Sequence, residues 1–333
     1  MAQALERWLP TRPHDPSGLC GWGRRSKVIR GRLPHEPGAG GEERLIDIGI
    51  GLPSTIPGIP GRLILQWASA AEQAGFSSLG TLDRVVYANL ETVPTLAAAA
   101  AVTERIGLTT AILIGPYRGN GALLAKQLAT VDAIADGRLR VGIAVGGRAD
   151  DYEATGSPFL ERGRAFDAQL AELRAVWAQQ PRGHAGPIGP TPVQPGGPPL
   201  LIGGNAAAAF RRMAEFGAGW IMGGGGPQGF AAGADKARRA WHQAGRAGQP
   251  RLVAIAYVSL GDDAETQARR YLTDYYSFIG DFAERIAAGA LTSPQKVADT
   301  VAGFTDAGCD ELILFPCNPD LRQIALTAGA AGL

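Results

Sequence analysis

Short apolar runs alternate with longer amphipathic or alanine-rich stretches from residue 45 to the C-terminus. Gly, Pro, Asp or Asn bounds most of the runs, as at strand ends, and the longer stretches space their apolar residues as helices do. The runs predict eight strands, at Leu45–Leu52, Ser78–Leu82, Leu108–Ile114, Leu139–Val145, Leu200–Ile202, Trp220–Met222, Leu252–Leu260 and Glu311–Phe315. The stretches between them predict helices at Arg62–Ala74, Thr95–Arg105, Ala122–Ala135, Phe159–Gln179, Ala206–Glu215, Gly229–Ala244, Ala264–Ala288 and Pro294–Ala307, with a last helix at the C-terminus.

This strict alternation of strands and helices favours a parallel sheet. Eight βα units match a TIM barrel, so the predicted fold class is α/β, a (β/α)8 barrel forming a single domain at residues 45–333. A doubly wound open sheet is the alternative. Residues 1–44 are rich in Pro, Gly and Arg without sustained periodicity, which predicts a mostly disordered N-terminal extension.

The composition narrows the classes of partner and the cellular compartment. The 333 residues carry a net charge of +1, so no charge imbalance favours a nucleic-acid or membrane partner. Three cysteines without a C-x-x-C motif indicate a reducing compartment. No apolar run approaches the length of a spanning helix, and the N-terminus lacks the apolar core of a signal peptide. We therefore expect a cytoplasmic protein.

The end of the fifth predicted strand is the first candidate site. In the stretch P-L-L-I-G-G-N-A-A-A-A, Gly203 and Gly204 allow a tight turn, and Asn205 is a predicted N-cap of the next helix. A helix N-terminus with open N–H groups binds phosphate without a cationic side chain. An ordinary βα turn is the alternative.

The other strand ends exclude several chemistries. They carry no lysine for a Schiff base, and the four histidines are scattered, with no H-E-x-x-H motif for a metal. The P-loop motif and the G-x-S-x-G elbow are absent too. Strand ends dominated by glycine, with few acids or bases, favour a cofactor that carries the reactivity itself. Asp47 lies inside the first strand, where it could face the barrel mouth or pair with an arginine beneath it. We expect it to play a structural role.

Six segments in order resemble the luciferase-like monooxygenase family, the (β/α)8 flavin- and deazaflavin-dependent oxidoreductases. They are A-A-E-Q-A-G-F-S-S-L-G-T-L-D-R (70–84), A-A-V-T-E-R-I-G-L-T-T-A-I-L-I (100–114), A-K-Q-L-A-T-V-D-A-I-A-D-G-R-L-R-V-G-I-A-V-G (125–146), F-L-E-R-G-R-A-F-D (159–167), P-V-Q-P-G-G-P-P-L-L-I-G-G-N (192–205) and S-P-Q-K-V-A-D-T-V (293–301). Each segment alone is a weak signal, but their common order over most of the chain is specific.

The resemblance implies roles for matching positions. Asp83 falls where the family places an acidic or polar residue near the reactive ring, and it is the catalytic candidate. Ala111-Ile112 match a non-proline cis peptide behind the ring in deazaflavin-using relatives. The other implied cofactor contacts are Gly146, Asp150, Gly203, Gly204, Asn205, Ala206, Gly223 and Gly224. From their places near strand ends, Tyr87, Tyr117 and Arg118 are candidates for the substrate pocket.

The implied function is a flavin-dependent oxidoreductase or monooxygenase that uses FMN with O2, or coenzyme F420 for hydride transfer, on a small organic substrate. The sugar-phosphate dehydrogenases among the relatives carry a lysine in the loop after the sixth strand. This chain has Gly223 through Gly226 there, which disfavours a phosphosugar substrate. No metal site is expected, and because relatives are often dimers, a homodimer stays open. The alternatives are a non-catalytic flavin carrier and an unrelated barrel isomerase with a phosphorylated substrate.

Overall fold

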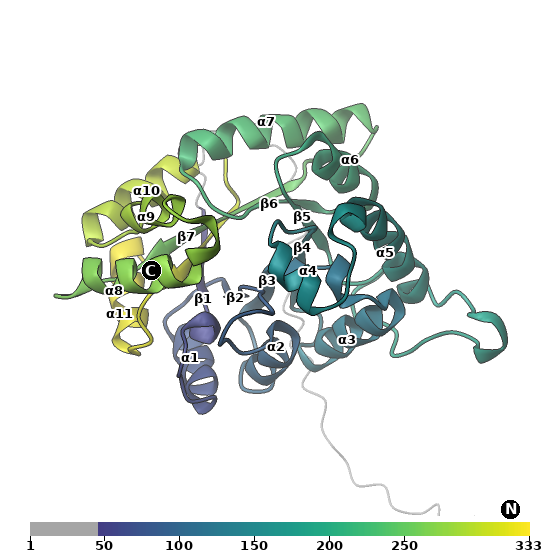
Figure 1. Cartoon of the computed structure of the whole chain (residues 1–333), viewed down its shortest axis with the longest axis horizontal. Coiled ribbons are helices and arrows are strands. Elements are labelled where there is room, and N and C mark those ends of the chain that lie inside the picture. The colour runs from purple at the N-terminus through teal and green to yellow at the C-terminus, as the bar shows by residue number, and fades with distance from the viewer. Residues whose placement is uncertain (1–45) are drawn as a thin grey trace, which may run out of the picture. The chain divides into compact units, whose positions relative to one another are not determined.

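The computed structural model describes residues 46–333, and these residues form a closed barrel of parallel strands with helices around it (Figure 1). The strands follow chain order around the barrel, and β1 closes it by pairing with β8. Their bounds are β1 Asp47–Gly51, β2 Ser78–Thr81, β3 Gly107–Ile114, β4 Leu139–Ala144, β5 Leu200–Gly203, β6 Gly219–Met222, β7 Arg251–Val258 and β8 Glu311–Pro316. The predicted barrel is confirmed, and the open sheet is excluded. The predicted extension at 1–44 lies outside the described residues.

The helices cover the outside of the barrel and bury its apolar outer face. Their bounds are α1 Arg62–Gln73, α2 Thr92–Ala100, α3 Gly121–Ile134, α4 Ala149–Ala154, α5 Arg162–Trp177, α6 Ala207–Phe216, α7 Pro227–Gln243, α8 Ala264–Tyr275, α9 Phe282–Ala288, α10 Pro294–Asp306 and α11 Arg322–Ala331. Ser293 caps α10 as its Ser-Pro start predicts, because its hydroxyl accepts the Lys296 N–H at 3.2 Å. Within the described part of the chain, no helix is long and apolar enough to cross a membrane.

Two helix predictions were wrong in ways that matter for the site. The predicted helix at 264–288 is broken, because α8 ends at Tyr275 and the chain turns through Gly280, at φ 57°, before α9 begins. The short helix α4 lies just after β4, where no helix was predicted. Both segments follow the carboxyl ends of strands, so they bring side chains over the barrel mouth.

A buried carboxylate joins several strands at the amino-terminal end of the barrel. Glu311 on β8 accepts hydrogen bonds from Ser78 (2.6 Å), Arg140 (3.2 Å) and Arg251 (3.0 Å). Arg251 also pairs with Asp47 at 2.9 Å, which confirms the structural role predicted for that aspartate. This end of a barrel serves stability rather than chemistry.

Candidate active site

The carboxyl ends of β3, β5 and β6 meet at one side chain, Ile112. A Cβ placed on Gly203 would lie 2.9 Å from Cδ1 of Ile112, and one placed on Gly223 would lie 3.3 Å from the same atom. The register between β3 and β4 shifts between Thr110 and Leu113, and the Ala111–Ile112 peptide bond is cis, as the resemblance implied. The structure thus brings three of the predicted cofactor positions together across the mouth.

Glycine conformation shapes the two loops beside Ile112. Gly204 has φ +114° and Gly224 has φ +138°, a region that other residues rarely adopt. Gly146, after β4, has φ +67°, and a Cβ there would meet Cγ2 of Ile114 at 2.9 Å. Glycine at Gly203 and Gly146 therefore lets Ile112 and Ile114 pack against the backbone, whereas nothing lies within 4 Å of a Cβ at Gly147 or Gly224, where the backbone is open to a ligand.

The predicted N-cap of α6 was wrong by one residue. The N-cap is Ala206, and no side chain caps the helix, because the positive φ of Gly204 carries the chain past Asn205 before the helix begins. The first residues of α6 are exposed, so their N–H groups face solvent. The start of α7 is similar, with Gly226 as N-cap, Pro227 next and no side-chain cap. An uncapped helix start attracts an anion through its open N–H groups and its dipole.

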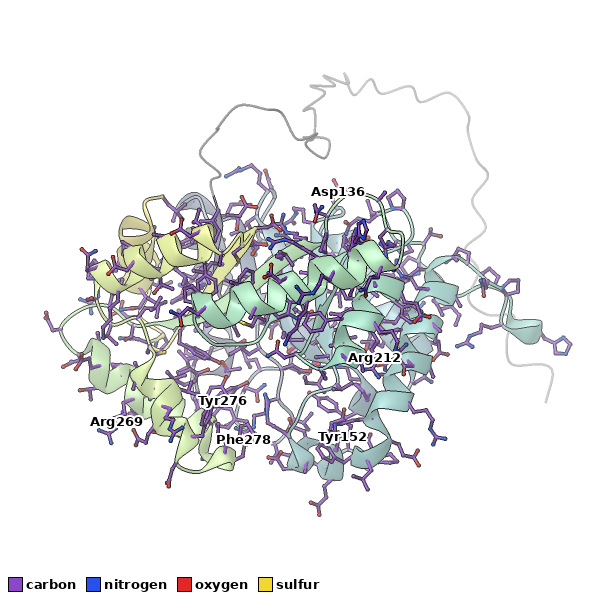
Figure 2. The ribbon with its side chains drawn as sticks, turned by 90° about the horizontal axis from the view of Figure 1, so that it is seen from above. Asp136, Tyr152, Arg212, Arg269, Tyr276 and Phe278 are labelled. Carbon is purple, nitrogen blue, oxygen red and sulfur yellow. The ribbon has the colours of Figure 1, made fainter. Side chains whose placement is uncertain are left out.

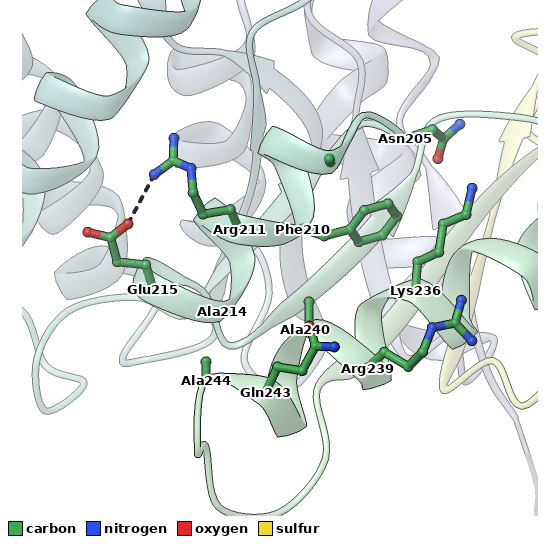
Figure 3. A pocket seen from close by; sticks show the side chains of 11 residues that line it. Asn205, Phe210, Arg211, Ala214, Glu215, Lys236, Arg239, Ala240, Gln243 and Ala244 are labelled. Atoms are coloured by element: carbon green, nitrogen blue, oxygen red, sulfur yellow. Dashed lines mark hydrogen bonds and ion pairs between the residues drawn. The ribbon is translucent and has the colours of Figure 1, made fainter.

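Asn205 instead lies at the head of an outer groove between α6 and α7, with a volume of about 800 Å³ (Figure 3). The groove is lined on its α7 side by Lys236 and Arg239, which have no carboxylate partner among the described residues. On its α6 side, Arg211 pairs with Glu215 at 3.2 Å. Positive charge therefore lies on the outer side of the α6 start.

Asp83 is buried after β2 and accepts four hydrogen bonds. Its Oδ2 accepts the Ile114 N–H at 2.8 Å and the Tyr117 hydroxyl at 2.7 Å. Its Oδ1 accepts from Arg118 at 2.8 Å and from the Thr92 hydroxyl at 3.1 Å. With both oxygens engaged, the carboxylate has no free position for a substrate proton. The geometry favours a positioning role over the catalytic role that the sequence suggested.

Tyr117 and Arg118 are held by the same carboxylate. Burial raises the pKa of the Tyr117 hydroxyl far above its ordinary value, and the charge of Asp83 adds to the effect. Burial alone would lower the pKa of Arg118, but Asp83 and Glu91 raise it overall. Arg118 also donates to Glu91 at 2.5 Å, so two carboxylates already occupy its guanidinium. Its predicted contact with a substrate anion would require one of these pairs to open.

Two arginines that the sequence analysis did not single out lie at the mouth. The guanidiniums of Arg84 and Arg148 lie 5.2 and 5.3 Å from the Phe278 ring centre and 5.6 and 5.7 Å from that of Tyr275. Arg84 also donates to the Tyr275 carbonyl at 2.5 Å. The signal was present in the sequence, since Arg84 directly follows Asp83 and Arg148 follows the glycines after β4.

Two further candidates contact this arginine cluster. Asp150, a predicted cofactor contact, pairs with Arg84 at 3.5 Å. Tyr87, a predicted pocket residue, packs edge-on against Tyr275 and donates its hydroxyl to Asp274. Both therefore lie on the β2–β4 side of the mouth, together with Asp83.

The other side of the mouth holds a cavity of about 540 Å³ near the ends of β6 and β7. Gly223 and Gly224 belong to its wall, which also includes Tyr257 and Tyr276. Figure 2 shows Tyr276 and Phe278 on the segment after α8. The ring centres of these two residues are 6.1 Å apart. Tyr276 was missed because α8 and α9 were predicted as one continuous helix, which hid the turn that brings it to the mouth. Tyr257 lies inside a correctly predicted strand but was not singled out.

Comparison with known proteins agrees with this architecture. A family model described as luciferase-like monooxygenase matches residues 45–311. The chain belongs to this family. Its curated relatives include the uncharacterized protein Rv0940c of Mycobacterium tuberculosis, 32% identical over 190 residues, which cover 48% of this chain and 65% of the relative. This match therefore spans less than two thirds of that relative's length.

Two proteins whose names describe an activity are also similar to this chain. An FMNH(2)-dependent dimethylsulfone monooxygenase of Pseudomonas putida is 28% identical over 262 residues, which cover 72% of this chain and 70% of that enzyme. A solved F420-dependent secondary alcohol dehydrogenase superposes with a TM-score of 0.71 at 16% identity, covering 86% of this chain and 99% of that one. At that identity the superposition shows a shared fold.

Within residues 46–333, no group of three or more His, Cys, Asp or Glu side chains could hold a metal ion.

Proposed function

We propose that this protein is an oxidoreductase that binds FMN or coenzyme F420 at the carboxyl end of its barrel. The observation that carries the proposal is the uncapped start of α6 beside a glycine-lined mouth. A phosphate group of the cofactor would lie at the N–H groups of Ala207 and Ala208, with Gly203 and Gly204 leaving room for it. The flat ring would lie near Ile112 and the Gly223–Gly224 loop.

The residues present fit such a group. A Cβ at Gly203 would come within 2.9 Å of Ile112, so glycine there lets Ile112 pack against the β5 backbone. Nothing lies within 4 Å of a Cβ at Gly224, so the backbone of that loop is open to a ligand. The cofactor, when bound, supplies redox chemistry with a small organic substrate, and O2 would be a further substrate if FMN is used. The chain binds the phosphate, excludes water and holds Tyr117 and Arg118 in place through Asp83. The relatives' names include both cofactors, and both remain in the proposal.

The cellular setting is part of the same proposal. The odd number of cysteines and the buried thiols of Cys309 and Cys317 suit a reducing compartment, so we place the protein in the cytoplasm. The near-neutral net charge supports small molecules rather than nucleic acid as partners. A homodimer, frequent among relatives, completes the proposal and can be checked by sedimentation.

A charge placed at the start of α6 tests the phosphate site. Ala206→Asp puts a carboxylate at the N-cap, where it caps the helix and repels a phosphate. Fluorescence titration should show affinity for FMN and F420 falling at least about tenfold, while the melting temperature does not fall. The matched control is Ala206→Asn, which caps the helix without charge and should change affinity less than about threefold.

Three results would contradict the proposal. If Ala206→Asp and the unmodified protein bind FMN and F420 with equal affinity, the cofactor phosphate does not bind at the start of α6. If neither cofactor binds but simple phosphate esters stabilise the protein, the isomerase alternative gains support. In the third test, reduced cofactor is loaded onto the protein anaerobically and mixed with candidate substrates, with O2 supplied as the oxidant for FMN. If a cofactor binds but no substrate accelerates its oxidation, the protein is a carrier.

A further inference from the structure

The cavity near the ends of β6 and β7 has a mainly apolar wall that includes a pair of tyrosines. Its apolar surface comes from side chains of β7, α9, α10 and the segment between the two helices, namely Ile255, Phe282, Ile286, Leu291 and Phe304. Its volume of about 540 Å³ lies in the range of small-molecule sites. The uncharged polar side chains of the wall are those of Tyr257, Tyr276 and Thr300. The only charged side chain in the described wall is Arg285, which is exposed at the rim.

The two phenols hydrogen-bond to each other, and this leaves one donor unused. Their oxygens are 2.6 Å apart, so one hydroxyl donates and the other accepts. No other hydrogen bond to either hydroxyl occurs among the described residues. Each phenol carries one proton, so the accepting phenol keeps a proton with no partner. The pair is partly buried in the cavity wall, so this proton is available to a ligand oxygen.

Packing holds the pair in place. The Tyr257 ring lies edge-on to Tyr276, with ring centres 6.0 Å apart, and 6.4 Å from the ring of Tyr271. The Tyr271 hydroxyl is bonded to Thr55 at 2.6 Å, so it is not available to the cavity. Burial raises the pKa of both Tyr257 and Tyr276 above the ordinary value, which keeps them neutral donors near neutral pH.

We infer that Tyr257 and Tyr276 form the recognition point for a neutral, mainly apolar substrate that carries a hydrogen-bond-accepting oxygen. The apolar wall takes the body of the molecule, and the free phenol proton is donated to its oxygen. An anion is disfavoured in the interior, because neutral phenols offer it no countercharge and the wall is apolar. The inference rests on the proposed function, since the same cavity borders the Gly223–Gly224 loop of the proposed cofactor site.

Binding of three probes of similar size tests the selection. Acetophenone has an acceptor oxygen, cumene lacks it, and benzoate carries a charge. Titration by saturation-transfer NMR should give acceptor selectivity in the unmodified protein, with acetophenone binding about five- to tenfold more tightly than cumene or benzoate. Equal binding of acetophenone and cumene, or tighter binding of benzoate, would overturn the inference without any substitution.

Substitution of the phenols locates the selectivity. The double variant Tyr257→Phe/Tyr276→Phe removes both donors and should weaken acetophenone binding about tenfold while cumene binding stays unchanged. Each single variant keeps one hydroxyl and should lose less. Tyr271→Phe is the matched control, because it removes a buried hydroxyl outside the cavity wall and should leave both probes unaffected. Unchanged acetophenone binding in the double variant would refute the role of the pair.

Cofactor titration separates this inference from the proposed function. The double variant should bind FMN and F420 within about threefold of the unmodified protein, because the phosphate lies at α6. Lost cofactor affinity with retained acetophenone binding would show that the phenols contact the cofactor, which overturns the inference and leaves the proposed function standing. If the unmodified protein binds neither cofactor, the proposed function fails, and the probe titrations still decide the role of the pair.

Discussion

Asp83 shows at the scale of one residue how surroundings determine a role. A buried carboxylate at the end of a barrel strand has the position of a catalytic group. In the structure, the Ile114 N–H, the Tyr117 and Thr92 hydroxyls and the Arg118 guanidinium occupy its oxygens. Their donated hydrogen bonds compensate its burial, and they tie the loops after β2 and β3 together.

Replacing this carboxylate should cost stability more than chemistry. Asp83→Asn leaves the largely buried Arg118 with Glu91 as its only carboxylate, and the free energy of unfolding should fall by on the order of 3 kcal/mol. Denaturant titration measures this. Asp150→Asn is the control, since its carboxylate is 37% exposed, its contact with Arg84 is 3.5 Å long, and an amide oxygen can still accept the Asp151 N–H, so it should cost less than about 1 kcal/mol. Equal losses in the two variants would show that the four hydrogen bonds contribute little.

The sequence could find most candidate positions but not how their side chains are used. Positions at strand ends follow from the order of apolar runs, and this correctly placed Gly203, Gly223 and Ile112 at one mouth. The partners of Asp83 lie 9 to 35 residues away in the chain, so no local pattern reveals them. The N-cap of α6 moved by one residue because the backbone angle at Gly204 is set by the turn as a whole.

At the scale of elements, glycines in β1 and β2 make room for an aromatic ring from β8. A Cβ on Gly51 would lie 2.2 Å from Cδ1 of Phe315, and one on Gly80 would lie 2.8 Å from its Cζ. Phe315 is fully buried in the barrel interior with Ile313 and Tyr257. Small residues on two strands thus allow one large residue on a third to fill the barrel, as close packing requires.

A methyl group on β1 should disturb this packing. Gly51→Ala is expected to lower the free energy of unfolding by about 1–3 kcal/mol through overpacking against Phe315. Gly61→Ala is the matched control, because nothing lies within 4 Å of a Cβ there and the change should stay within about 0.5 kcal/mol. Thermal unfolding of both variants gives the comparison. Partial rescue of Gly51→Ala by Phe315→Leu would assign the loss to the ring, and its absence would argue against overpacking.

At the scale of the whole molecule, one buried charge joins distant parts of the barrel. Glu311 on β8 is fully buried and contacts Arg140 from β4, Arg251 from β7 and Ser78 from β2. Burial alone would raise the pKa of this carboxyl, but Arg140 and Arg251, with the serine hydroxyls, bring it below the ordinary 4.5. The folded state therefore holds Glu311 ionised where the unfolded chain would bind a proton.

This linkage predicts a loss of stability in acid. The contribution of Glu311 is complete above its unfolded pKa of 4.5 and is lost as the pH falls through the lower folded value. Near neutral pH, Glu311→Gln should cost about 3–5 kcal/mol, because the largely buried Arg140 loses its carboxylate partner and Arg251 keeps only Asp47. The gap between variant and unmodified protein should narrow below pH 4.5 in denaturant titrations.

Glu284→Gln is the control for the acid effect. Its carboxylate is exposed and pairs with Arg269 on the surface at 3.1 Å, so its cost should stay below about 1 kcal/mol at every pH. A Glu311→Gln variant whose deficit is constant from neutral to acid pH would show that the carboxyl does not titrate differently in the folded and unfolded states.

The sequence by itself determined the barrel, the glycine-rich strand ends and the absence of lysine from them. These follow from local physics, because apolar periodicity sets the elements and strict alternation sets a parallel order. Only the tertiary structure decided that Asp83 is saturated, that Ile112 meets Gly203 and Gly223, and that Tyr257 meets Tyr276 across the turn after α8. Those facts depend on contacts between distant segments, whose geometry arises when the barrel closes and the chain breaks at Gly280.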